Sequence, residues 1–568
     1  MITYRLLLRF LYYRGDNVIE YLNHALLQYH VYNTDHFRDS SPFFDHITRK
    51  LEGNLIPRDV KNILSVILAD LFAQPRFFTA HGFSLETVEQ ELGEVARSIL
   101  SMVMQEFRSE YHKVRYQRPV DPVTENELCR FIALITPHRV NEYLEAAPIP
   151  ENLPLVNLVR QQFGTINPEV KCAVFVQHLF ASTVPMIQAL AGDHIAPEGV
   201  FILGKPYSTN YATLLRLRSK GFFVHPGSVH YEGGKEYHEE ADQHIDSLLE
   251  RAILYFETVR TSPEHKILLV DDGGRAIRML HHSRYARWLP CFCFVEQTRR
   301  GIRELQDLDL KAPVMNVAES RAKLEFESPL IAESILTELN NTLRKVEEIN
   351  LLHSRKFLVV GFGAIGQAVA REVLEKGFEV GVYDIDASKV AHVDQQVYTV
   401  ENDLVQALPK YNIILGCTGY QALDFNMYEH ISNGSILVSG SSSDVEFSSW
   451  KLRSIASAIS DKFRYNDDYN LVIERYGDQL LYLGDTDYPC YFLYLIRFKG
   501  KEFFLVNGGF PINMTGDYDP IPPKKIQLTR ALLYYAGVAA SYQQSTGLIP
   551  LPVKDQAYII EQFSRLQQ

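Results

Sequence analysis

The segment 357–384, FLVVGFGAIGQAVAREVLEKGFEVGVYD, constrains the fold of this chain more than any other stretch. It opens with a short apolar run typical of a buried strand, continues with apolar residues at helical spacing, and closes with a second apolar run. Between the first run and the helix stands a G-x-G-x-x-G turn, formed by Gly361, Gly363 and Gly366. A strand, a glycine turn, a helix and a second strand in this order predict a Rossmann unit that binds a dinucleotide.

Each glycine of the turn has a physical role. Gly361 permits the tight turn, Gly363 lets a pyrophosphate approach the backbone at the helix N-terminus, and Gly366 lets the helix pack closely on the strand. Asp384 comes 23 positions after Gly361, where a carboxylate accepts hydrogen bonds from a ribose 2′-hydroxyl and repels a 2′-phosphate. The sequence therefore predicts NAD in preference to NADP, held by Asp384 and by the loop residues Gly361, Gly363, Ala364, Ile365 and Gly366.

Length and composition exclude several classes of protein. A chain of 568 residues with 46% hydrophobic content should form several domains, and three is a reasonable number. The net charge of −12 and the absence of a basic run with interleaved aromatics argue against a nucleic-acid partner. The six cysteines show neither C-x-x-C nor zinc spacing, which predicts buried thiols and no metal site. No segment reaches membrane-spanning length and no signal-peptide cleavage site is evident, so a cytoplasmic protein without membrane association is expected.

The fold class predicted is α/β, with three regions along the chain. Residues 1–150 alternate segments of helical period with polar breaks, which predicts an all-α region whose role, including contact with a protein partner, stays open. Residues 151–332 alternate short apolar strands with helices and predict a doubly wound substrate domain, completed by about 510–568. Residues 333–509 form the Rossmann NAD-binding domain, with an antiparallel hairpin expected over 491–504.

Eight short motifs occur in one order along the chain. They are QHLF around His178, LLVDDGG at Asp271 and Asp272, VEQTRRG at 295–301, PVMNVAESRAKLEFES ending at Ser328, GFGAIG, GCTG at 416–419, SSSDVEF around Asp444, and FFLVNGG at 503–509. In this order, from about residue 153 to about residue 560, the chain resembles the S-adenosylhomocysteine hydrolase family. These enzymes contain NAD and have a two-part nucleoside-binding domain around a Rossmann domain, and the resemblance implies that Thr418 of GCTG contacts the cofactor.

The resemblance also implies a chemistry and its residues. In this family bound NAD⁺ oxidises a ribose 3′-hydroxyl, the ketone acidifies the 4′ C–H, and elimination and water addition follow at C5′ before the hydride returns. Lys323 matches the lysine that takes the hydroxyl proton, and His178 and Asp272 match the pair that handles the 4′ proton. Thr298 matches a residue near the nicotinamide ribose, and Asn507 matches one that contacts the nicotinamide carboxamide.

The substrate end departs from the family pattern. Gln297 stands where a glutamate grips the ribose hydroxyls, and Glu327 replaces the aspartate that orients the lysine. The groups expected to recognise adenine, homocysteine and the nicotinamide are also replaced, by Phe180, Ser182, Ser442, Met514 and Ala332. The chain also stops at Gln568, without the family's lysine- and tyrosine-bearing tail. The redox end of the site is therefore expected to survive, and the substrate end to differ.

Two questions stay open at this level. Arg299 and Arg300 replace small hydroxyl residues and form either an anion site or a solvated loop with a salt bridge to Glu304. The chain is either an NAD-dependent enzyme acting on a nucleoside or nucleotide, or a catalytically degraded NAD-binding regulatory or scaffold protein. In the first case Lys323, His178, Asp272 and Glu327 are catalytic, and Gln297, Thr298, Arg299 and Arg300 bind a small nucleoside-like substrate. Formation of a homo-oligomer also stays open.

Overall fold

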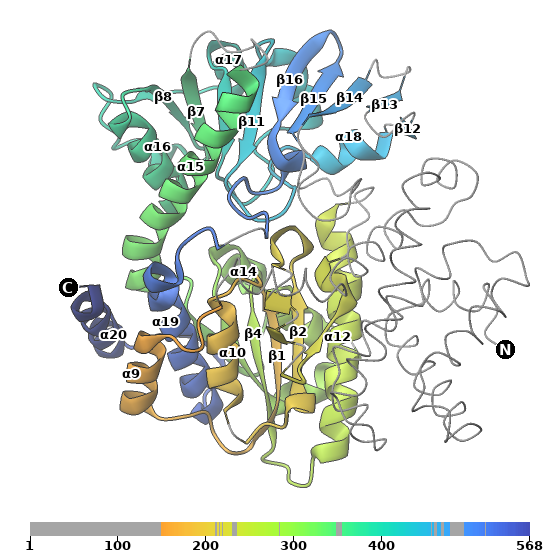
Figure 1. Cartoon of the computed structure of the whole chain (residues 1–568), viewed down its shortest axis with the longest axis vertical. Helices are drawn as coiled ribbons and strands as arrows, with labels where there is room; N and C mark the ends of the chain where they lie inside the picture. Colours follow the sequence, from red (N-terminus) through yellow and green to blue (C-terminus); the bar gives the residue numbers. More distant parts are fainter. Residues whose placement is uncertain are drawn as a thin grey trace, which may run out of the picture.

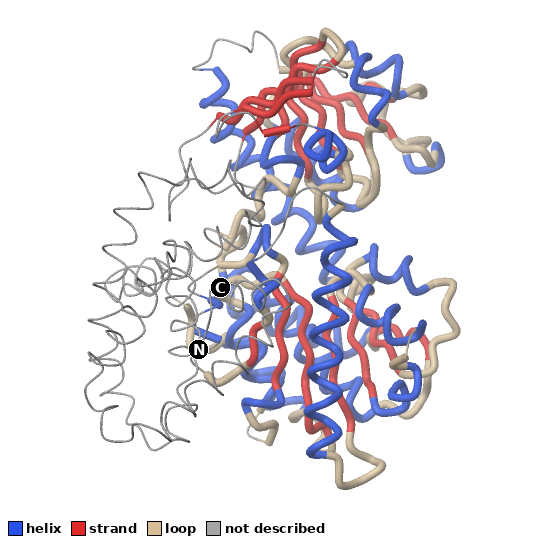
Figure 2. Tube along the Cα trace, turned by 90° about the vertical axis from the view of Figure 1, so that its right-hand side faces the viewer, coloured by secondary structure: helices blue, strands red, loops and turns tan. Residues whose placement is uncertain are grey.

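The computed structural model describes residues 149–567, apart from 193, 211–212, 215, 218–219, 230–235, 283, 348–354, 456, 459–462, 467–470, 477–492 and 517–518. The all-α region expected at the N-terminus lies outside the described residues. So does the apolar run QLLYLG at 479–484, whose composition predicts a strand. The described chain forms two α/β bodies, each built on one sheet, with the long helix α15 (Ser328–Glu347) running between them (Figures 1 and 2). The α/β fold class predicted from the sequence is confirmed.

The first sheet has seven parallel strands in an order that reverses direction once. From one edge to the other the strands are β3 (Phe223–Val224), β2 (Val200–Gly204), β1 (Val170–Gln177), β4 (Lys266–Asp271), β5 (Phe292–Glu296), β6 (Pro313–Asn316) and β17 (Gly547–Pro550). The order runs outward from β1 on one side and from β4 on the other. The point between β1 and β4 is therefore the topological switch point, where open α/β sheets bind ligands.

Helices cover both faces of this sheet, because successive side chains of a buried strand point to opposite faces. In β1, Ala173 and Phe175 enter one apolar cluster, and Cys172 and Val174 enter another. The first cluster contains residues of α9 (Pro154–Phe163), α10 (Thr183–Ala191), α19 (Pro523–Tyr542) and α20 (Val553–Gln567), and the second those of α12 (Tyr237–Val259) and α13 (Arg275–His282). The C-terminal helix α19 is buried on nearly all sides and packs against β4, β5 and β6.

The second sheet repeats this arrangement and adds antiparallel strands at one edge. Its parallel part has the order β9 (Thr399–Val400), β8 (Glu379–Tyr383), β7 (Lys356–Val360), β10 (Ile413–Gly416), β11 (Ser435–Ser439) and β16 (Lys501–Leu505). Antiparallel strands follow in the order β15 (Leu493–Phe498), β14 (Leu471–Tyr476), β13 (Phe463–Asn466) and β12 (Ser457–Ala458). The hairpin β15–β16 turns at Lys499 and Gly500, both with positive φ, which confirms the predicted hairpin.

Helices and turns cover both faces of the second sheet and form its apolar core. On one face, α15 and α16 (Ala364–Glu375) pack over β7, β8, β10 and β11. On the other, apolar residues from α17 (Leu404–Ala407) and from the 3-10 turn at Phe425–His430 cover the sheet. The predicted helical face of the glycine segment is also confirmed, because Val369 and Val373 are buried and Ile365 packs against the same cluster. Gly377 ends this helix with φ at 83°.

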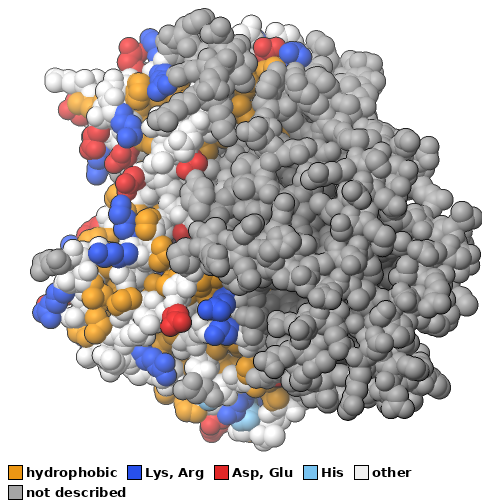
Figure 3. Space-filling model, in the orientation of Figure 1, with side chains coloured by type: hydrophobic (Ala, Val, Ile, Leu, Met, Phe, Trp, Pro, Cys, Tyr) orange, Lys and Arg blue, Asp and Glu red, His pale blue; other side chains and the backbone are white. Residues whose placement is uncertain are grey.

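The surface charges, the cysteines and the polarity of the helices can each be compared with the composition of the chain. Basic and acidic side chains are interspersed over the described part of one face (Figure 3). The four cysteines that the structure describes, Cys172, Cys291, Cys293 and Cys417, are buried free thiols. Within the described ranges, every helix is too short or too polar to cross a membrane.

Candidate functional site

The glycine loop after β7 forms a cradle at the N-terminus of α16. Gly361 has φ at 96°, and an added Cβ there would lie 2.7 Å from the carbonyl carbon of Cys417. An added Cβ at Gly366 would overlap the carbonyl oxygen of Gly361. At Gly363, in contrast, the space within 4 Å of an added Cβ is empty, and α16 begins at the next residue. Backbone N–H groups at a helix N-terminus with open space before them fit the pyrophosphate of a dinucleotide.

Asp384 follows β8 and is held by the glycine loop. Its carboxylate accepts hydrogen bonds from the backbone N–H of Phe362 at 2.7 Å and of Asp386 at 2.9 Å. Lys389 also donates to both carboxylate oxygens at 3.2 Å. The position suits a ribose contact, but Lys389, which the sequence interpretation missed, neutralises part of the charge expected to repel a 2′-phosphate.

A cavity of about 270 Å³ lies between the two bodies. The second body contributes the start of α16 and the loops after β10 and β11. The first body contributes the loops that follow β1, β4 and β5, together with α19. Of the residues predicted from the sequence, the cavity is lined by His178, Asp272, Gln297, Thr298, Arg299, Arg300, Lys323, Glu327, Ala364 and Ile365.

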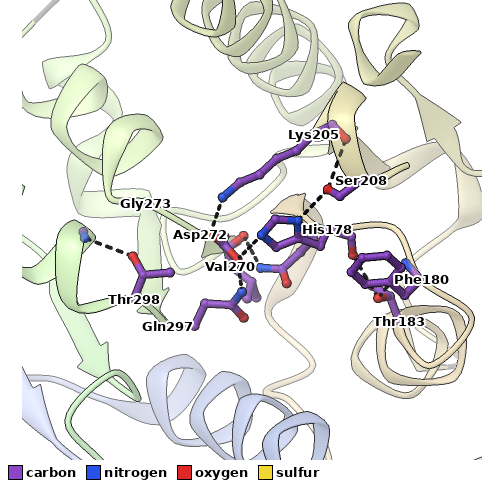
Figure 4. A network of polar contacts seen from close by, with 12 residues as sticks. His178, Phe180, Thr183, Lys205, Ser208, Val270, Asp272, Gly273, Gln297 and Thr298 are labelled. Carbon is purple, nitrogen blue, oxygen red and sulfur yellow. Dashed lines mark hydrogen bonds and ion pairs between the residues drawn. The ribbon is translucent and has the colours of Figure 1, made fainter. Parts of the chain in front are cut away.

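Four polar residues of the first body each follow a parallel strand by one position. His178 follows β1, Lys205 follows β2, Asp272 follows β4, and Gln297 follows β5. Because the carboxyl ends of parallel strands meet at one edge, side chains far apart in the sequence converge there. Figure 4 shows Lys205, His178 and Gln297 pointing toward the carboxylate of Asp272. The sequence interpretation missed Lys205, although its place directly after an apolar strand was a usable signal.

Asp272 is the electrostatic centre of this group. Burial alone would raise the pKa of its carboxyl, but the buried ammonium of Lys205 holds that pKa well below the usual range. The amide of Gln297 donates to the other carboxylate oxygen. Lys205 is stabilised in turn, because Asp272 outweighs the effect of burial and raises its pKa. Asp272 is therefore a carboxylate with both oxygens engaged.

His178 lies beside this pair as a neutral imidazole. Burial first, and the charge of Lys205 second, lower its pKa to about 3. Its Nε2 is 3.7 Å from Asp272, a contact that is not an ion pair at neutral pH because the ring is uncharged. Its Nδ1 lies 2.5 Å from the hydroxyl oxygen of Ser208, and the ring stacks on Phe180 with centroids 5.9 Å apart. A neutral imidazole facing a cavity is able to accept a proton.

Lys323 and Glu327 are placed by an irregular helical turn. Residues Lys323–Glu327 form a π-helical turn that leads directly into α15. Such turns are rare in proteins as a whole, but many of those that occur lie at functional sites. The Nζ of Lys323 donates to Glu327 at 2.7 Å, and the hydroxyl of Thr529 donates to the other oxygen of Glu327 at 2.5 Å. The longer arm of Glu327 thus still reaches the lysine, as the sequence interpretation assumed.

Three further predicted residues of the lining, Thr298, Arg299 and Arg300, follow β5 on the first-body side of the cavity. Thr298 caps α14 (Arg299–Leu305) by accepting from Gly301 N–H at 2.9 Å, and Arg300 lies 5.8 Å from the ring centre of Tyr420. Among the described residues, neither Arg299 nor Arg300 forms the salt bridge to Glu304 that one interpretation expected, and Nη1 of Arg300 is buried without a hydrogen-bond partner. The anion-site interpretation stays a prediction.

Thr418 lies beside Gly361 of the cofactor cradle, Asn507 lies in the turn that follows β16, and both are outside the lining of the cavity. Thr418 donates its backbone N–H and its hydroxyl to Glu446, each at 2.8 Å. Burial raises the pKa of Glu446 to about 7. Asn507 has φ at 48° and donates its amide to the carbonyl of Ile512 at 3.1 Å. Their roles toward the cofactor stay predictions.

Comparison with known proteins supports the assignment of the glycine cradle as a cofactor-binding site. Residues 356–458 match the family described as the NAD binding domain of 6-phosphogluconate dehydrogenase. This stretch begins with β7 and includes the whole glycine cradle. The chain therefore contains an NAD-binding Rossmann domain, and its cofactor is NAD.

Similarity over longer stretches is weaker. An uncharacterized protein of Mycobacterium tuberculosis is 26% identical over 393 residues, which cover 69% of each chain. An adenosylhomocysteinase of Acinetobacter baylyi is 23% identical over 275 residues, which cover 44% of this chain and 57% of that enzyme. The solved NAD-dependent formate dehydrogenase of Staphylococcus aureus is 12% identical, over 50% of this chain and 77% of its own, with a TM-score of 0.28.

Proposed function

We propose that the protein is an NAD-dependent enzyme that acts on a nucleoside or nucleotide through transient oxidation of a ribose 3′-hydroxyl. One observation carries the proposal. Lys323 with its carboxylate partner, and His178 beside Asp272, face a single cavity whose other wall begins at the NAD cradle. The 23% identity with an adenosylhomocysteinase supports the same reaction type.

Bound NAD supplies the hydride acceptor for this chemistry. Lys323 takes the proton of the 3′-hydroxyl, and Glu327 stabilises the ammonium that forms because it lies 2.7 Å away and is fixed by Thr529. His178 is neutral and accepts the proton from C4′ once the adjacent carbon is a ketone. Asp272 stabilises the imidazolium that results. Both acid–base groups are held by partners on rigid strand ends or helical turns, which keeps their geometry constant.

S-adenosylhomocysteine itself is a poor candidate for the substrate. Gln297 is uncharged and already donates its amide to Asp272, so it offers no carboxylate to ribose hydroxyls. Ser442 and Met514 line the cavity where the resemblance expects histidines on the homocysteine side. Each lost polar partner costs on the order of 1–3 kcal/mol, so several losses multiply to a large defect.

A second candidate is an NAD-binding regulatory or scaffold protein without turnover. The observation that favours it is that Lys205 and Gln297 together engage both oxygens of the Asp272 carboxylate. A site with no chemistry would tolerate such an arrangement. The two candidates differ in whether any bound ligand reduces the cofactor.

The test mixes NAD-loaded protein with a panel of nucleosides, 5′-nucleotides and S-adenosylhomocysteine, and follows absorbance of the reduced nicotinamide. We expect at least one ribose ligand to produce bound NADH. Lys323→Met should slow that step by about 10²–10⁴ with NAD affinity nearly unchanged. Lys554→Met, at an exposed lysine of α20, is the matched control and should change nothing.

Two outcomes contradict the proposal. If ligands that bind by calorimetry never reduce the cofactor, the regulatory protein becomes the better account. If Lys323→Met reduces NAD as fast as the parent, Lys323 has no part in the chemistry. Thiol release from S-adenosylhomocysteine at an ordinary turnover, on the order of 10 s⁻¹, would overturn the exclusion of that substrate.

A further inference from the structure

A buried arginine of α19 lines the cavity together with residues of the loop between β1 and α10. Arg530 of α19 is 6% exposed and lines the cavity together with Phe180 and Ser182. Its Nε donates to the hydroxyl of Ser182 at 3.2 Å. Among the described residues this is its one hydrogen bond, and it forms no ion pair there. A guanidinium has five N–H donors, so most of its donor capacity is unused.

Two lysines near the cavity, in contrast, each have a carboxylate partner. Lys205 contacts Asp272, and Lys323 lies 2.7 Å from Glu327. Burial of an unpaired guanidinium is costly, and desolvation accordingly lowers the pKa of Arg530. Asp519 is the acidic residue whose charge stabilises Arg530 most. Its carboxylate, however, accepts hydrogen bonds from the backbone N–H groups of Ala181 and Ser182, at 2.7 and 3.3 Å. The unused donors therefore need an acceptor that the protein does not supply.

The lining of the cavity that Arg530 enters favours a flat, uncharged acceptor. Phe180 presents a ring, and Met514, Ile521 and Ile526 add apolar lining to the same cavity. The carboxylate of Asp519 would repel a phosphate or carboxylate brought to the same place. A planar heterocycle with two adjacent acceptor atoms satisfies both the apolar walls and the guanidinium fork.

We propose that Arg530 selects a 6-oxopurine base on the substrate. This inference rests on the proposed function, in which the substrate is a nucleoside or nucleotide. A 6-oxopurine offers the acceptors O6 and N7 side by side, the pair that a guanidinium binds with two parallel hydrogen bonds. Adenine offers N7 but carries an amino donor at position 6, which faces the donors of the guanidinium. Adenine is therefore the disfavoured base.

Calorimetric titration of the full-length, NAD-loaded protein with inosine and adenosine tests the inference. We expect inosine to bind about 5- to 150-fold more tightly, the range for one bidentate pair. Arg530→Gln should abolish the preference. Arg530→Lys keeps the charge and loses the fork, so it should also lose most of the preference, whereas a purely electrostatic role would leave it intact.

A second measurement keeps the inference falsifiable if the Arg530 variants do not fold. The unaltered protein is titrated with 7-deazainosine, which lacks the N7 acceptor and should bind more weakly than inosine by roughly tenfold. Equal binding of inosine and adenosine, or of inosine and 7-deazainosine, overturns the inference. If adenosine binds equally and still reduces the cofactor, the proposed reaction stands and the base assignment falls. If inosine binds selectively without reducing the cofactor, the base assignment stands and the reaction falls.

Discussion

The two sheets share the order of six parallel strands, yet the residues that follow those strands differ in kind. After β7 and β10 of the second sheet come glycines and backbone groups, in the Gly361 turn and the loop of Thr418. After the strands of the first sheet come charged or polar side chains, such as Lys205, Asp272 and Gln297. One end of the cavity is therefore shaped by the backbone and the other by side chains.

Because of this difference, amino-acid substitutions affect the two ends of the cavity differently. A cradle of backbone N–H groups depends on glycines at fixed positions, so its ligand is hard to change without losing the turn. A set of side chains at strand ends is replaced one residue at a time, while the strands stay in place. The cofactor end consequently keeps a recognisable pattern, and the substrate end combines a retained Lys323 and Asp272 with Lys205 and Arg530.

The largest effect on stability is expected at the charged end. Lys205→Met should lower the free energy of unfolding by about 3–5 kcal/mol, because it leaves the carboxylate of Asp272 buried without its cation. Lys311→Met is the matched control, since Lys311 pairs with Asp309 on the exposed surface and should cost at most about 1 kcal/mol. Urea denaturation measures both. Equal losses for the two variants would show that the Lys205 pair contributes no more than a surface contact.

A smaller effect is expected from pH. The pKa of His178 is about 3 in the folded protein, whereas the ordinary value of 6.5 applies to the unfolded chain. Between these two pH values the unfolded chain therefore binds more protons than the folded protein. Stability should therefore fall as pH drops below about 6.5, by about 2 kcal/mol between pH 7 and pH 5 from this group alone. His178→Gln should reduce the pH dependence by that amount, and the exposed His430→Gln should not. An unchanged pH dependence in His178→Gln would mean that the pKa of His178 is the same in the folded and the unfolded chain.

The smallest effect is expected at the cofactor end. Asp384→Ala should reduce the preference for NAD over NADP by roughly tenfold. This factor is near the low end of the free energies of hydrogen bonds to charged groups, because Lys389 already neutralises part of the carboxylate charge. Calorimetric titration of cofactor-free protein with NAD and NADP measures the preference. Equal affinities of the parent protein for both cofactors would remove Asp384 as the determinant.

The sequence predicted the backbone-built end better than the side-chain-built end, for a physical reason. A glycine turn between two strands is contiguous, so Gly361 and Asp384 were evident within one short segment. The side-chain end draws on β1, β2, β4, β5 and α19, which meet only after folding. His178 and Asp272 were identified through a family pattern, whereas Lys205 and Arg530 lie outside the motifs that carry that pattern and were missed. A lone arginine in the apolar run of α19 was the available signal for Arg530.

The central claim is that oxidation at C3′ makes the neighbouring C4′ proton exchangeable. The most direct measurement incubates the NAD-loaded protein with inosine in deuterated water and examines the recovered nucleoside by NMR. The account predicts deuterium at C4′, with incorporation slowed by about 10²–10⁴ in Lys323→Met and little changed in Lys554→Met. A nucleoside that binds and is recovered with its C4′ proton intact would contradict the account.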